Sequence, residues 1–153
     1  MRLAVWTSYS RIPRSSLVRL FAAYLVKMIK TKDRTPCPFG SYYEFGTGWG
    51  GTLAAFMLAA EQIASTHDLT ADDFRVFAFD TFEGLPPSAH PADRHAAWRE
   101  GAMASSVDVI RQKIATHPFA RRVPVQYIKG TFEESLTDAL IERLRPFPPT
   151  RND

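Results

Sequence analysis

Residues 44–51 read Glu-Phe-Gly-Thr-Gly-Trp-Gly-Gly and join a short apolar run to a long one at residues 52–64. Gly46, Gly48 and Gly50 make the pattern G-x-G-x-G, and Gly46, Gly48 and Gly51 also fit G-x-G-x-x-G. Between a strand and a helix, such glycines allow a tight turn, close approach of backbone N–H groups to a ligand, and close packing of the helix on the strand. The stretch therefore predicts a binding site for a nucleoside cofactor. The alternative is a tight turn that binds nothing.

Two acidic residues flank this turn. Glu44 precedes Gly46, and Asp80 ends the next apolar run, at residues 75–79. The Asp80 carboxylate can accept hydrogen bonds from two ribose hydroxyls. It lies further beyond the glycines than the roughly 20 residues that separate them from the acid in the dinucleotide fingerprint. Glu44 would repel a pyrophosphate and attract a cationic amine, which argues against NAD. The alternatives are a Glu44 satisfied by backbone N–H groups and an Asp80 that caps the turn at residues 81–84.

The rest of the chain alternates between helical and strand patterns. Apolar residues at helical spacing, Leu20 among them, follow Ser15-Ser16 and predict a helix with a serine cap. Capping-box spacings at residues 105–108 and 131–134 predict two later helices, the second running to Leu144. The predicted order is a helix at 17–28, then strands at 41–45, 75–79 and 123–128, each followed by a helix. We expect an α/β fold: a Rossmann-like parallel sheet with helices on both faces, incomplete at about three strands.

Length and composition fit a single globular domain of 153 residues with 45% hydrophobic residues. We expect an N-terminal helical segment and linker at residues 1–37, a cofactor-binding α/β domain at 38–145, and a disordered tail at 146–153. The net charge is +3, and the basic residues are scattered rather than gathered in a stripe, so nucleic acid is not an expected partner.

The same sequence argues against membrane and metal binding. The apolar run at residues 17–29 contains Arg19 and Lys27, so we expect neither a membrane span nor a signal peptide, and a cytoplasmic protein. The one cysteine rules out an internal disulfide. His90, Asp93 and His95 do not have the spacing of a familiar metal site, and we expect no metal there.

Four motifs resemble the class I S-adenosylmethionine-dependent methyltransferases, and most of all the macrocin O-methyltransferase (TylF-like) group. The matching stretches are Gly-Ser-Tyr-Tyr-Glu-Phe-Gly at 40–46, Gly-Gly-Thr at 50–52, Phe-Asp-Thr-Phe-Glu-Gly-Leu-Pro at 79–86, and Lys-Gly-Thr-Phe at 129–132 followed by Glu-Ser-Leu at 134–136. The third stretch is the most specific. The resemblance covers about residues 38 to 145.

The resemblance implies that S-adenosyl-L-methionine is the cofactor and that a hydroxyl of a small-molecule acceptor is methylated. The implied cofactor-binding residues, each at a matching position, are Glu44, Gly46, Thr47 and Gly48 for the methionine part, Asp80 for the ribose hydroxyls, Thr81 and Phe82 beside the adenosine, and Thr131 and Phe132 at the edge of the adenine. No catalytic residue is identified.

The sequence departs from the family after the third strand. Relatives continue into a fourth strand, where an acidic cluster binds magnesium, and residues 146–153 show no strand pattern. We therefore expect the cofactor-binding part of an enzyme, inactive or nearly so alone. Without a fourth strand, the first strand lies at an open sheet edge, and we expect self-association there. Two other interpretations remain: an NAD(P)-binding oxidoreductase fragment and a non-catalytic nucleoside-binding remnant.

Overall fold

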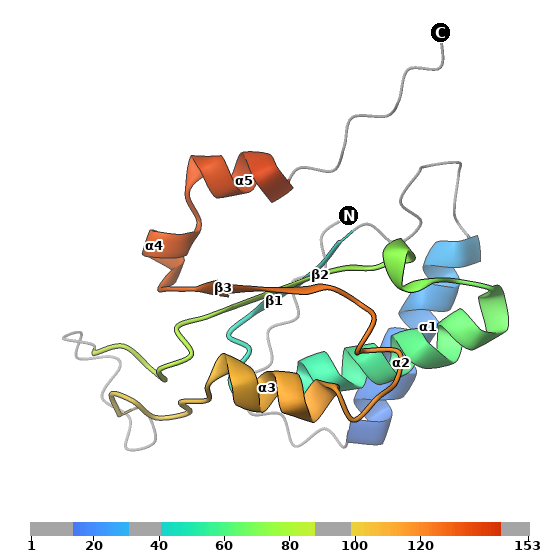
Figure 1. Ribbon diagram of the computed structural model, residues 1–153, viewed down its shortest axis with the longest axis horizontal. Coiled ribbons are helices and arrows are strands. Elements are labelled where there is room, and N and C mark those ends of the chain that lie inside the picture. Colours follow the sequence, from blue (N-terminus) through green and yellow to red (C-terminus); the bar gives the residue numbers. More distant parts are fainter. Residues whose placement is uncertain (1–13, 31–40, 88–98, 145–153) are drawn as a thin grey trace, which may run out of the picture.

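The computed structural model describes residues 14–30, 41–87 and 99–144 of the chain, and the residues between and beyond them lie outside the description. The described elements alternate along the chain as the sequence pattern predicts (Figure 1). They are α1 (Arg14–Lys30), β1 (Ser41–Phe45), α2 (Gly51–His67), the 3₁₀ turn η1 (Ala71–Asp73), β2 (Arg75–Asp80), α3 (Val107–Ile114), β3 (Val125–Lys129), α4 (Phe132–Ser135) and α5 (Asp138–Leu144).

The three strands form one parallel sheet in the order β1-β2-β3. Ala78 of β2 is in register with Glu44 of β1 and with Tyr127 of β3. The central strand is buried from Val76 to Phe79, as expected for a strand that is covered on both faces. The predicted Rossmann-like α/β sheet of about three strands is thus confirmed.

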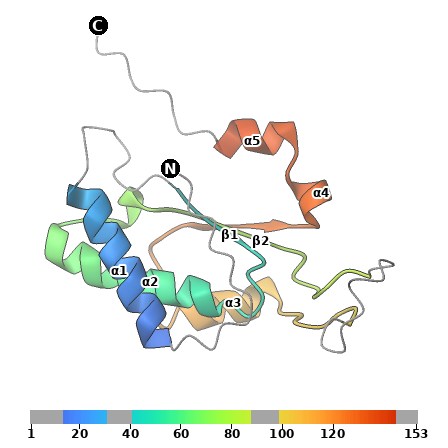
Figure 2. The same cartoon turned by 180° about the vertical axis from the view of Figure 1, so that it is seen from behind.

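Helices α1, α2 and α3 cover one face of the sheet (Figure 1). Helix α2 is rich in alanine, and Ala54, Ala55, Ala59 and Ala60 are fully buried, so this helix packs closely against its neighbours. Figure 2 shows α1 lying against α2 on this same side. Phe21 of α1 packs edge-on there against Tyr42 of β1 and Phe56 of α2.

Helices α4 and α5 lie on the opposite face (Figure 1). Leu140 and Leu144 of α5 pack with Phe77 and Phe79, the β2 residues that point to this side. The Tyr43 hydroxyl donates a hydrogen bond of 3.1 Å to the Leu144 carbonyl oxygen and ties α5 to β1. Helices therefore cover both faces of the sheet.

Two predicted helix starts are wrong in detail. Ser15 and Ser16 lie inside the first turn of α1, which begins at Arg14. Leu20 was predicted on the buried stripe but is 60% exposed, because the core-facing residues of α1 are Val18, Phe21 and Leu25. In α3 the cap is Ser106, whose hydroxyl accepts a hydrogen bond from the Val109 N–H at 3.3 Å.

The helix predicted from residue 132 to Leu144 is two helices. The capping box at Thr131 and Glu134 is present as predicted. Leu136 then leaves the helical conformation, with φ −86° and ψ 54°. The Thr137 hydroxyl accepts a hydrogen bond from the Leu140 N–H at 3.3 Å, so Thr137 starts a second helix in a new direction. The break turns α5 back over the sheet face.

Candidate functional site

A glycine bend joins β1 to α2. Gly46, Gly48 and Gly50 have φ angles of 72°, 48° and 67°, in the left-handed region that favours glycine. A Cβ atom at Gly46 or Gly48 would meet no heavy atom within 4 Å, whereas one at Gly50 would lie 2.9 Å from Cγ2 of Ile110 in α3. Gly50 is therefore needed for packing, and the first two glycines leave open space beside the backbone.

Hydrogen bonds hold the bend against β2 and α3. The Gly46 N–H donates to the Phe79 carbonyl oxygen at 2.8 Å, and the Gly50 N–H donates to Thr47 at 2.8 Å. The buried Thr47 hydroxyl also donates to the Phe79 carbonyl oxygen, at 3.5 Å, so this side chain points at β2. The Lys113 ammonium of α3 donates to the Trp49 carbonyl oxygen at 2.6 Å.

Asp80 connects this bend to the turn after β2. Its Oδ2 accepts a hydrogen bond from the Gly48 N–H at 2.7 Å, and its Oδ1 accepts one from the Phe82 N–H at 2.9 Å. The turn-capping alternative is therefore realised. A carboxylate offers about four acceptor positions, so two backbone donors leave capacity for ligand hydroxyls at this half-buried group.

Glu44 lies beneath the bend and is 2% exposed. Its Oε2 accepts a 2.6 Å hydrogen bond from the Tyr42 hydroxyl, and its Oε1 has no hydrogen-bond partner among the described residues. Burial raises the pKa of Glu44 to about 7, while the Tyr42 hydroxyl and the Leu53 backbone N–H act to lower it and the charge of Asp80 adds to the rise. Burial, with Glu44 beside it, raises the pKa of Tyr42 far above its ordinary range, so Tyr42 remains a donor.

Glu44 and Asp80 lie on the same face of the sheet. Glu44 is in register with Ala78, and both belong to the face that α2 covers. Asp80 is two residues beyond Ala78, and side chains two residues apart along a strand share a face. The carboxyl ends of β1 and β2 therefore bring both acids to the glycine bend.

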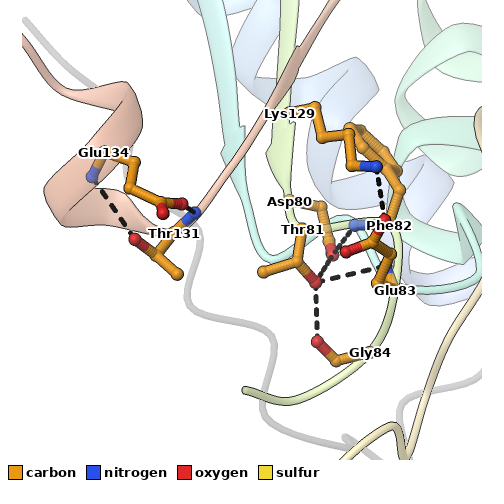
Figure 3. Close-up of polar contacts among 8 residues, drawn as sticks. All are labelled: Asp80, Thr81, Phe82, Glu83, Gly84, Lys129, Thr131 and Glu134. Carbon is orange, nitrogen blue, oxygen red and sulfur yellow. Dashed lines mark hydrogen bonds and ion pairs between the residues drawn. The ribbon is translucent and has the colours of Figure 1, made fainter.

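Thr81 and Phe82 form the turn that follows Asp80 (Figure 3). The Thr81 hydroxyl donates to the Gly84 carbonyl oxygen at 2.6 Å and accepts from the Glu83 N–H at 3.2 Å. Phe82 is buried in a left-handed conformation, and its ring lies edge-on to Tyr127, with centroids 6.0 Å apart. Both side chains thus stabilise the turn that presents Asp80.

Thr131 and Phe132 lie past the end of β3, next to Asp80 through a backbone hydrogen bond of 3.1 Å from the Gly130 N–H to the Asp80 carbonyl oxygen. The Thr131 hydroxyl caps α4 by accepting from the Glu134 N–H (Figure 3). Phe132 is 46% exposed and stands edge-on to Phe45, with centroids 5.8 Å apart. The pair adjoins the bend from the α4 side of the sheet, opposite to Glu44.

The site contains contacts that the sequence analysis did not identify. Tyr42 was missed as the partner of Glu44, although its position two residues earlier on a strand puts it on the same face. The contacts of Lys113 and Ile110 with the bend join segments far apart in the chain and have no local signal. His90, Asp93 and His95 lie outside the described residues, and within the described part no three His, Cys, Asp or Glu side chains gather as a metal site would require.

A solved structure with a similar fold is that of CalS11, a calicheamicin methyltransferase. The TM-score is 0.54 at 20% sequence identity, and the likeness covers 86% of this chain and 51% of that one. The chain thus spans about half the length of that protein. No curated protein matches the sequence.

The helices that the structure describes do not include one with both the length and the apolar character needed to cross a membrane. The family model of the macrocin O-methyltransferases (TylF) matches residues 25–146, and the chain belongs to this family.

Proposed function

We propose that the glycine bend binds S-adenosyl-L-methionine and that the chain is the cofactor-binding part of a methyltransferase. One observation carries the proposal: two carboxylates share one sheet face beside a bend whose Gly46 and Gly48 leave open space. An uncharged bend between two acids suits a ligand with a cationic end and a ribose. It suits a pyrophosphate poorly, because both acids would repel it.

Different residues of the site would bind different parts of the cofactor. Oε1 of Glu44, which has no partner among the described residues, would accept a hydrogen bond from the cationic methionine part. This part would lie close to Gly46 and Gly48, where no side chain fills the space. Asp80 would accept the ribose hydroxyls with its remaining acceptor positions. Phe82 and Phe132, from the turn after β2 and the start of α4, would border the adenosine.

Bound S-adenosyl-L-methionine supplies a methyl group for a single displacement by the acceptor, for which positioning provides much of the acceleration. The family name supports a hydroxyl of a small molecule as acceptor. We assign cofactor binding to this chain and name no catalytic residue.

Calorimetry with S-adenosylhomocysteine and NAD tests the cofactor. We expect saturable heat with S-adenosylhomocysteine and none with NAD, because the two acids face the bend. Heat with NAD alone would contradict the proposal and favour the oxidoreductase alternative. Methyl transfer measured with mixed small-molecule hydroxyl acceptors then separates an active enzyme from a nucleoside-binding remnant.

Replacement of Asp80 tests its assigned role. Asp80→Ala is expected to weaken S-adenosylhomocysteine binding by about 1–3 kcal/mol through lost hydrogen bonds. Asp73→Ala is the matched control, because Asp73 accepts the Thr70 N–H at 2.7 Å before β2, at the opposite end of the strand from Asp80. Equal affinities of the two variants, measured by calorimetry, would remove Asp80 from the site.

A further inference from the structure

The two carboxylate oxygens of the buried Glu44 differ in their hydrogen bonding. Tyr42 donates to Oε2 of Glu44 at 2.6 Å, while Oε1 is buried without a partner among the described residues. An unsatisfied buried carboxylate oxygen is costly, and natural proteins keep one where it has a use. The Leu53 backbone N–H also acts on this carboxylate but leaves Oε1 without a hydrogen bond, and this oxygen therefore supports a ligand group that completes it.

Aromatic packing fixes the donor of this pair. The Tyr42 ring stacks on Phe56 of α2, with centroids 3.9 Å apart and planes 10° apart. Phe21 of α1 stands edge-on to the same ring, with centroids 5.9 Å apart. A ring held on two sides has one orientation, so its hydroxyl holds the carboxylate of Glu44 in one rotamer.

No cation compensates Glu44 within the described part of the chain. From β1 it faces the Tyr42 hydroxyl, and from β2 it faces Asp80, which adds a like charge. Helix α2 offers the backbone N–H of Leu53, and its first ten residues, 51–60, carry no charged side chain. Helix α1 contributes the apolar Phe21. Helix α3 contributes the apolar Ile110, and the ammonium group of its Lys113 donates to the Trp49 carbonyl oxygen at 2.6 Å.

We propose that Tyr42 is a positioning residue that holds one oxygen of Glu44 and leaves the other for a cationic amine of the cofactor, so that cofactor binding releases the proton of Glu44. The inference rests on the proposed function. Only a proton moves: the O–H bond of the Glu44 carboxylic acid breaks, the proton passes to the buffer, and the carboxylate pairs with the ligand ammonium. The pKa of Glu44, raised by burial to about 7, makes the acid form available at neutral pH.

Two ligands distinguish this coupling from general nucleoside binding. S-Adenosylhomocysteine carries an ammonium group, whereas 5′-methylthioadenosine has the same nucleoside and thioether without the amino acid part. Proton release is measured by calorimetry in two buffers of different ionisation enthalpy. For S-adenosylhomocysteine we expect release of about 0.9 proton at pH 6 and about 0.1 at pH 8, with affinity about tenfold higher at pH 8. The control ligand should release none and bind equally at both pH values.

Two tyrosine variants test the positioning role. Tyr42→Phe removes the donor that lowers the pKa of Glu44, so the midpoint of the affinity change should move upward by about one pH unit or more. Tyr43→Phe is the matched control: it removes a hydroxyl from the adjacent residue of β1, on the opposite face, where it donates to Leu144. Its midpoint should equal that of the natural sequence. Glu44→Gln should release no proton with either ligand.

The outcomes separate this inference from the proposed function. If S-adenosylhomocysteine binds without proton release, or if Tyr42→Phe and Tyr43→Phe share one midpoint, the coupling is wrong and cofactor binding stands. If S-adenosylhomocysteine does not bind to the natural sequence, the proposed function itself is wrong. Thermal melting of each variant shows whether it is folded, and Glu44→Gln supplies the proton-release test should Tyr42→Phe fail to fold.

Discussion

Glu44 illustrates at the level of one residue how the proposed binding site would cost stability. Its carboxyl group is buried without a counter-ion among the described residues, and burial raises its pKa from an ordinary value of 4.5 to about 7. A residue chosen for packing alone would be apolar here, as its neighbours on α2 are. The proposed ligand site would explain why an acid, and not an apolar residue, occupies this buried position.

The pH dependence of stability should report this conflict. Between pH 4.5 and 7 the folded chain binds more protons at Glu44 than the unfolded chain, so the free energy of unfolding falls as pH rises and then levels above pH 7. Glu44→Gln should remove this fall and be more stable by about 3 kcal/mol above pH 7. Urea unfolding from pH 4.5 to 8 measures it. The exposed Glu133→Gln is the control, and identical profiles for both variants would contradict the buried charge.

At the level of elements, local signals predicted the strands and the site loops well. The glycine pattern predicted the bend, the capping box at Thr131 predicted the start of α4, and the acid at Asp80 predicted the end of β2. The sequence pattern does not predict the break at Leu136, because the apolar spacing continues across Thr137 as it would in one helix. Contacts between elements, such as Lys113 with Trp49, depend on tertiary structure and leave no pattern in the sequence.

The glycines of the bend should differ in their tolerance of a side chain. Gly48→Ala places a Cβ at φ 48° and is expected to cost about 1–2 kcal/mol of stability. It also fills the space proposed for the ligand. We therefore expect weaker S-adenosylhomocysteine binding even under conditions in which the variant is folded. Gly51→Ala, in the first turn of α2 with nothing near its Cβ, should be neutral or gain up to about 1 kcal/mol and bind normally.

Urea unfolding and calorimetry on the two glycine variants decide between a binding bend and a structural one. Equal affinity of Gly48→Ala and Gly51→Ala for S-adenosylhomocysteine would show that the open space at Gly48 is not used. A loss confined to Gly48→Ala supports the site, since both substitutions add the same methyl group, one in the bend and the other at the start of α2.

At the level of the whole molecule, helices cover both faces of the sheet, and no strand in the described part of the chain pairs with the outer edge of β1. Helices α1 to α3 and helices α4 and α5 cover the two faces (Figure 1), whereas among the described residues β1 pairs only with β2. An uncovered edge presents unpaired backbone N–H and C=O groups to other chains.

We expect the 153-residue chain to self-associate through β1, because edge-to-edge pairing of two copies satisfies these backbone groups. Sedimentation equilibrium should show a mass that rises with concentration above the 17.2 kDa of one chain. Ser41→Glu adds a charge to the edge strand, opposite Arg75 of β2 in register, so the fold gains a favourable cross-strand pair while two apposed edges repel. This variant should remain at the mass of one chain at low salt and associate more as salt screens the repulsion. A mass of one chain for both proteins at every concentration would mean that β1 is not an association surface.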